Sequence, residues 1–166
     1  MTGPTAPKDD GREESLAERM DRNWAELVQE LRVLQTGVQI LAGFLLTLPF
    51  QSRFETLDDY QTNLFLANVV VAALTTATIL LPVSVHRRLF QQGLKSTLVT
   101  SADTIAKIAL AGVALLSVGT TSLVFDVTAG RTAGVIAGVG LLAVLVLLLV
   151  LVPAWIRHRA RQEESL

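Results

Sequence analysis

The chain contains no cysteine and few charged residues, and both shortages limit what it can do. Without cysteine it forms no disulfide and has no thiolate metal ligand or thiol nucleophile. Only 17% of its 166 residues are charged, while 51% are hydrophobic. The charges gather at the ends of the chain and in short connecting segments. The long stretches between them therefore offer little ionic chemistry.

Four long apolar runs without charge occupy residues 33–52, 60–85, 108–125 and 132–156. An α-helix needs roughly 20 residues to cross about 30 Å of hydrocarbon, because every backbone polar group in lipid must be satisfied within the segment. The pattern predicts an all-α protein, a four-helix transmembrane bundle, with spans at about 33–52, 61–85, 105–126 and 132–156. Its size leaves room for one compact bundle and no separate globular domain.

Three segments outside the bundle are expected in the cytoplasm. Residues 1–14 are rich in Pro, Gly and Asp and predict a disordered tail, and residues 157–166 form a basic and acidic tail. Residues 15–32 predict an amphipathic helix that opens with a capping box at Ser15 and Glu18 and continues into the first span. Its apolar residues recur in steps of three and four: Ala17, Met20, Trp24, Leu27, Leu31, Leu34, Val38 and Leu41.

That apolar stripe has three possible partners. It can lie on membrane lipid in the headgroup plane, pack against its own bundle, or pair with the same helix of a neighbouring subunit. The polar face mixes both signs of charge, which weakens the case for attraction to anionic lipid. We expect packing on the same chain or on a partner, because an exposed apolar stripe of this length needs a surface to cover it.

The distribution of lysine and arginine predicts the orientation. Twelve of the fourteen basic residues flank the spans on one side, and only Arg53 and Arg131 fall in the two short connections on the other. The positive-inside rule then places both termini in the cytoplasm of a multi-pass protein of the cell membrane. The second outer connection is expected to run from Asp126 to Arg131. Asp58 and Gln61 are expected to cap the second span.

Small residues mark expected helix contacts. Gly130, Gly134 and Gly138 recur every four residues at the start of the fourth run, and Gly112 and Gly119 lie in the third. Small residues let helix backbones approach closely in lipid, where burial from water no longer drives association. The spacing favours tight packing and leaves open whether the partner helix belongs to the same chain or another.

Prolines and a polar cluster are the remaining features inside the spans. Pro82 and Pro153 lie near the inner ends of the second and fourth spans, where each should kink its helix. Arg32, Gln35 and Gln39 share one face at the start of the first span. The simplest role of this polar intramembrane cluster is hydrogen bonding between helices.

Chemistry that would identify an enzyme or an ion carrier is sparse. No ionisable residue lies near the middle of any span, although a proton or sodium carrier normally needs one there. No nucleophile, acid–base pair or set of metal ligands stands out, so we expect no catalytic residues, no metal and no cofactor.

Three segments resemble one family. They are WAELVQELRVLQTGVQIL at residues 24–41, LPFQSRF at 48–54 and HRRLF at 86–90. They are similar to a family of small four-span actinobacterial integral membrane proteins of unknown function, whose members are sometimes labelled sodium:proton antiporters. The resemblance covers nearly the whole chain after about residue 20. It implies four spans and carries over no functional residue.

The residues favour a non-enzymatic membrane protein, an accessory or scaffold that works through helix contacts. Its expected partners are membrane lipids and a homo-oligomer or larger membrane complex, and no nucleic acid. The alternative is a small cation/proton antiporter or another transporter.

The bias of basic residues predicts a reporter outcome. A reporter fused after Leu57 should lie outside the cytoplasm, and one fused after Leu94 should lie inside. Protease accessibility in intact cells measures both, and the reverse pattern would contradict the orientation.

Overall fold

The computed structural model describes residues 16–89 and 95–163, and every described element is helical. The long helices are α1 (Leu16–Thr47), α2 (Asp59–Leu89), α3 (Lys95–Ala129), α4 (Arg131–Val146) and α5 (Val152–Glu163). Two short 3₁₀ helices, η1 (Leu48–Phe50) and η2 (Ser52–Thr56), join α1 to α2, and a π-helical turn, η3 (Leu147–Leu151), joins α4 to α5.

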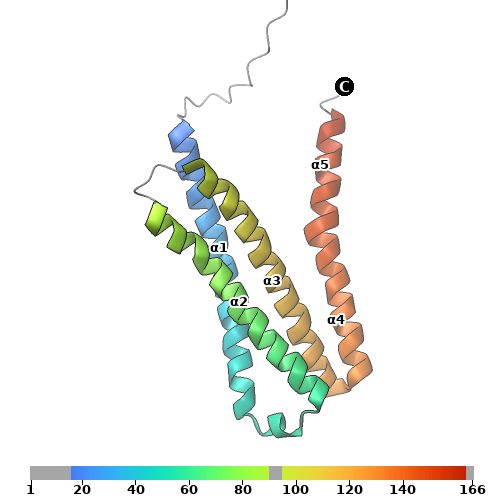
Figure 1. The fold of residues 1–166 in the computed structure, drawn as a ribbon. Helices are drawn as coiled ribbons and strands as arrows, with labels where there is room; N and C mark the ends of the chain where they lie inside the picture. Colours follow the sequence, from blue (N-terminus) through green and yellow to red (C-terminus); the bar gives the residue numbers. More distant parts are fainter. Residues whose placement is uncertain (1–15, 90–94, 164–166) are drawn as a thin grey trace, which may run out of the picture.

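Four helical segments are long and apolar enough to cross a membrane: Arg22–Phe50, Asp59–Pro82, Thr104–Ala129 and Arg131–Gln162. The chain is therefore an all-α membrane protein with four spans. The start of α1 and the end of α5 lie at the same end of the molecule (Figure 1). The η1–η2 connection and the junction between α3 and α4 lie at the opposite end, called here the turn end.

Proline ends the first span. Pro49 cannot donate a backbone hydrogen bond and disfavours helical backbone at the residue before it, so α1 stops at Thr47. The chain then closes two tight turns, with the Gln51 N–H donating to the Leu48 carbonyl and the Leu57 N–H to the Phe54 carbonyl. Phe54 lies edge to face against Phe65, with ring centroids 5.1 Å apart. This contact attaches the connection to the core.

The core lies between α1, α2 and α3, and each helix supplies three buried residues spaced seven apart. They are Leu31, Val38 and Leu45 from α1, Phe65, Ala72 and Ile79 from α2, and Ala109, Leu116 and Leu123 from α3. A seven-residue repeat keeps one stripe of a helix facing its neighbours and is typical of left-handed bundles. The apolar face of the amphipathic helix thus packs on its own bundle, with Leu27, Leu34 and Leu41 against the core.

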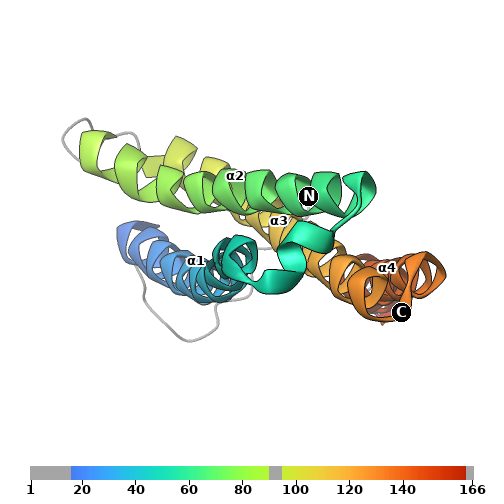
Figure 2. The ribbon, with the colours of Figure 1, turned by 90° about the horizontal axis from the view of Figure 1, so that it is seen from below.

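The fourth span is attached at one end only. Among the described elements, α4 packs along α3 and reaches α2 only through its first residue, Arg131, and α5 contacts only the π turn between it and α4. Figure 2 shows α4 beside α3 and away from α1. Most apolar side chains from Val144 onward are exposed, including Trp155 and Ile156. Membrane lipid or another protein must cover this half of the span.

Pro153 follows the π turn. A proline ring clashes with the carbonyl four residues earlier, which here belongs to Leu149 within that turn. The wider π turn moves that carbonyl and lets the helix continue without a break. Pro82 is buried within α2, which also runs on to Leu89.

The connection between the third and fourth spans is shorter than the sequence predicted. The expected loop from Asp126 to Arg131 was wrong, because α3 continues to Ala129 and Gly130 alone separates it from α4. Gly130 has a φ of +94°, a conformation that other residues rarely adopt, and this permits so tight a reversal. The cap at Asp58 and Gln61 is confirmed, since each side chain bonds the other's backbone N–H. The expected disordered tail, residues 1–14, lies outside the described residues.

The closest contact between α3 and α4 predicts a stability difference between two glycines. A Cβ at Gly134 would lie 2.7 Å from Asp126 Cβ and 2.8 Å from the Ser122 carbonyl oxygen, whereas one at Gly140 meets nothing within 4 Å. Gly134→Ala should therefore destabilise the protein by about 1–3 kcal/mol through overpacking, and Gly140→Ala should not. Thermal unfolding in mild detergent measures both, and equal melting temperatures would refute the packing argument.

Candidate functional site

A polar seam runs between α2 and α3. Each helix contributes residues at seven-residue intervals, and the two antiparallel rows meet in three steps: Gln61 with Asp126, Asn68 with Gly119, and Thr75 with Gly112. A Cβ at Gly112 would overlap the Thr75 hydroxyl, and one at Gly119 would overlap the Asn68 amide. The polar side chains of α2 thus occupy space that α3 leaves open by having glycine.

Asn68 and Thr75 are satisfied within their own helix. The Asn68 Nδ2 donates to the Leu64 carbonyl at 2.8 Å, and the Thr75 hydroxyl donates to the Val71 carbonyl at 2.7 Å. Both residues are buried. Because these donors bond to carbonyls of their own helix, the Asn68 and Thr75 steps of the seam hold α2 and α3 together by close packing rather than by hydrogen bonds between the helices.

The seam ends at the turn end in a charged cluster. Arg131 Nη2 lies 2.6 Å from Asp58 Oδ2, and its Nε lies 2.8 Å from Asp126 Oδ2. The same guanidinium stacks over the Tyr60 ring, 3.7 Å from its centroid. Gln61 Nε2 donates to Asp126 Oδ1 at 2.6 Å. One arginine therefore joins the start of α2, the end of α3 and the start of α4.

The Asp126 carboxylate is the buried member of this cluster. Its side chain is 2% exposed, whereas that of Arg131 is 44% exposed. The Arg131–Asp126 contact is an ion pair without a well-aimed N–H, since Asp126 Oδ2 accepts no hydrogen bond in the part of the chain described. Charge pairing still compensates the cost of burying the carboxylate.

The cluster is suited to holding helix ends together. Both Asp126 oxygens are next to a donor group, and Asp58 is used in the cap of α2. Residues 16–89 and 95–163 contain no group of three or more His, Cys, Asp or Glu side chains that could hold a metal ion. We therefore regard the cluster as a clamp between three helices, and call it the Arg131 clamp.

The predicted packing glycines fall into two groups. Gly112 and Gly119 face α2, while Gly134 and Gly138 face α3, where the Ser122 hydroxyl donates to the Gly134 carbonyl at 3.0 Å. Gly130 does not belong with them. A Cβ there would meet nothing within 4 Å, so its assignment to helix packing was wrong and its role is the turn.

The predicted polar cluster is only partly brought together. Arg32 and Gln35 line a small cavity of about 150 Å³ against α2, next to Pro82. Gln39 does not line that cavity and is exposed. In the described ranges no hydrogen bond joins the three side chains. The sequence placed the three residues correctly on one helix. It did not show that Arg32 and Gln35 border α2 while Gln39 is exposed.

Sequence reasoning did not identify the Arg131 clamp or the seam. Asp126 and Arg131 carry opposite charges on either side of Gly130, which is a usable signal for a tight turn closed by an ion pair. The seam has a weaker signal, because the seven-residue spacing of Gln61, Asn68 and Thr75 identifies a face without naming its partner.

The Arg131 clamp predicts non-additive mutant effects. Arg131→Gln should destabilise the protein by about 3–5 kcal/mol, because it leaves the Asp126 carboxylate buried without a counter-charge. Adding Asp126→Asn removes that charge and should recover part of the loss. A double-mutant cycle of unfolding in detergent measures the coupling. Simple additivity would show that the ion pair contributes nothing.

Comparison with known proteins gives a family and no function. Neither a curated protein nor a solved structure matches the chain. A family described as a family of unknown function, DUF6328, matches residues 13–153, which include all four membrane-spanning segments except the end of the last. The chain belongs to this family of unknown function, DUF6328.

Proposed function

We propose that the protein is a non-enzymatic accessory or scaffold protein that acts through helix contacts in the membrane, and that its first partner is a second copy of itself. The observation that carries the proposal is a stripe of polar and small residues along an exposed side of α1. The stripe consists of Arg32, Thr36, Gln39 and Gly43, all exposed and spaced four, three and four residues apart. We call it the α1 stripe.

Gln39 is the residue that needs a partner. It lies seven residues, or about 10 Å, beyond Arg32 along the first span. Its carboxamide is exposed on the molecule and forms no hydrogen bond within the described residues. A primary amide facing hydrocarbon loses the hydrogen bonds that water would provide. A hydrogen bond from another helix would restore them, and such bonds are a known contribution to association in lipid.

A second copy fits this need well. Two chains inserted in the same orientation carry Gln39 at the same depth, so a two-fold axis along the membrane normal can bring the two amides together. Each amide has donors and an acceptor, and the pair is therefore self-complementary. Arg32 ends the stripe where the uncharged run of the first span begins, and from there its long side chain can extend toward lipid headgroups rather than the other Arg32.

Gly43 supports the same face. Glycine weakens a helix by about 1 kcal/mol relative to alanine, so a glycine within a span normally serves a close contact. A Cβ at Gly43 would meet nothing within 4 Å in a single chain. No contact within the bundle accounts for the glycine, whereas approach of a second helix would. The exposed half of the fourth span leaves further surface for a larger complex.

The antiporter alternative has less support. Asp126 is the one buried charged side chain among the described residues, and it is paired with Arg131 at a helix end. An ion-coupled carrier needs a site within the membrane that can take up and release its ion. We also propose, from the basic-residue bias, that the termini are cytoplasmic in the cell membrane.

The proposal predicts that Gln39→Leu weakens dimerisation. Loss of hydrogen bonds between two helices in lipid costs roughly 1 kcal/mol, which corresponds to about five- to tenfold weaker association. Light scattering in mild detergent and energy transfer between labelled copies in liposomes measure the monomer–dimer equilibrium.

Gln35→Leu is the matched control. It makes the same chemical change one turn away, on the side that faces α2, and should leave dimerisation unchanged. A strictly monomeric wild-type protein in liposomes, or an equal effect of both variants, would reject the α1 stripe as the contact.

A further inference from the structure

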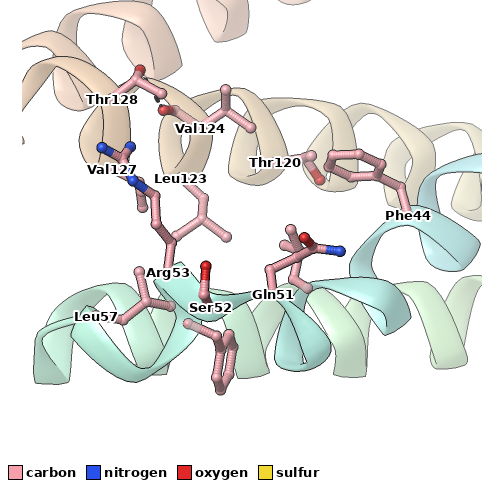
Figure 3. A pocket seen from close by; sticks show the side chains of 12 residues that line it. Phe44, Gln51, Ser52, Arg53, Leu57, Thr120, Leu123, Val124, Val127 and Thr128 are labelled. Carbon is pink, nitrogen blue, oxygen red and sulfur yellow. Dashed lines mark hydrogen bonds between the residues drawn. The ribbon is translucent and has the colours of Figure 1, made fainter.

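A cavity of about 390 Å³ opens at the turn end, between the end of α1, the η1–η2 connection and α3. This volume falls in the range of small-molecule pockets. Its walls are mostly apolar and include Phe44, Leu48, Leu123 and Val127. Figure 3 shows Arg53 rising from the connection toward α3 at one end of the cavity, and Thr120 near Phe44 at the other.

Thr120 carries a polar group with no partner. The residue is 8% exposed, and its Oγ1 is buried without a hydrogen bond in the part of the chain described. Two hydroxyl groups of the same helix, those of Ser117 and Thr128, donate to the carbonyl four residues earlier, and that of Ser122 donates to the Gly134 carbonyl of α4. A buried hydroxyl without a partner costs free energy. A molecule bound in the cavity could remove that cost by offering Thr120 a hydrogen-bond acceptor.

Arg53 provides a charge at the other end. It forms no ion pair with any described residue, in contrast to Arg131, which holds two aspartates. A guanidinium at a membrane boundary has the geometry to bind phosphate through two N–H groups. The cavity thus combines an apolar body, a cationic end near the surface and an uncommitted hydroxyl at greater depth.

We propose that this cavity binds an anionic glycerophospholipid from the surrounding leaflet, with its phosphate at Arg53, one acyl chain along the apolar wall and an ester oxygen accepting from Thr120. A phospholipid carries its ester groups deeper in the membrane than its phosphate. This order matches the cavity, where Arg53 lies near the surface and the Thr120 hydroxyl lies deeper. A free fatty acid has one polar end and would leave the Thr120 hydroxyl unpaired. The site is independent of the α1 stripe, which lies on another part of α1.

Thermal unfolding and photo-crosslinking of the full chain in non-ionic detergent test the site. The probes are phosphatidylglycerol, zwitterionic phosphatidylcholine and oleic acid, and a photoactivatable phosphatidylglycerol maps the contact by mass spectrometry. We expect saturable stabilisation by phosphatidylglycerol alone, with crosslinks to the cavity wall. Equal stabilisation by phosphatidylcholine, or saturable binding of oleic acid in its place, would overturn the proposal.

Variants separate binding from folding. Val124→Trp fills the cavity from its exposed edge and should abolish the stabilisation, whereas Val135→Trp, equally exposed on α4 and outside the cavity, should not. Arg53→Gln should weaken phosphatidylglycerol binding roughly tenfold through loss of a charged hydrogen bond. Arg157→Gln, on α5, should have no effect. Lipid stabilisation that survives Val124→Trp would place the lipid elsewhere.

Thr120→Val should affect the protein differently without lipid and with lipid. Without lipid it removes an unsatisfied buried hydroxyl and should leave the melting temperature unchanged or higher. With lipid it removes a hydrogen bond and should weaken binding roughly fivefold. Thr121→Val, one residue along and outside the cavity, is the control. A lower melting temperature without lipid, together with unchanged affinity, would show that the hydroxyl has only a structural role.

Discussion

The close approach of α3 to two neighbours is the contact on which the bundle depends. Helices in lipid gain little from burying apolar side chains, so they associate through close packing and hydrogen bonds. α3 offers Gly112 and Gly119 to α2, and it receives Gly134 and Gly138 from α4. The Arg131 clamp then joins the same three helices at one end. Without these contacts the fourth span would have no attachment to the other described helices, because α4 packs along α3 and reaches α2 only through Arg131.

Much of this architecture could be predicted from the sequence, because length and hydrophobicity determine it directly. Four uncharged runs gave four spans, and Asp58 with Gln61 gave the cap of α2. The glycine spacing identified four residues that do lie in helix contacts. It failed at Gly130 because spacing alone does not distinguish a glycine that admits another helix from one that adopts a positive φ.

The identity of the facing residue could not be predicted. Asn68 and Thr75 were visible as polar residues within a span, but their fit against Gly119 and Gly112 depends on the antiparallel register of two helices far apart in sequence. Arg32, Gln35 and Gln39 were grouped by helical periodicity, which specifies a face and not its surroundings. The unpaired hydroxyl of Thr120 depends on local geometry, since neighbouring hydroxyls bond to their own helix.

The polar groups within the spans therefore fall into two classes, those that find a hydrogen-bond or ion-pair partner in the chain and those that do not. Those of the seam and of the Arg131 clamp have partners and hold the bundle together. Gln39 and Thr120 lack them among the described residues, and we infer a second copy for the first and a lipid for the second. A protein that works by contact would be expected to keep such groups on its outer faces and in its cavities.

A cysteine cross-linking scan along α1 in native membranes tests the contact most directly. The chain has no cysteine of its own, so each single substitution reports only its own position. Disulfide-linked dimers are expected to form on oxidation with cysteine at Thr36, Gln39 or Gly43, and to be absent with cysteine at Gly37 or Phe44, which lie roughly 100° around the helix from the middle of the stripe. Cross-linking centred on Gly37 and Phe44, or at no position of α1, would contradict a dimer formed through the α1 stripe.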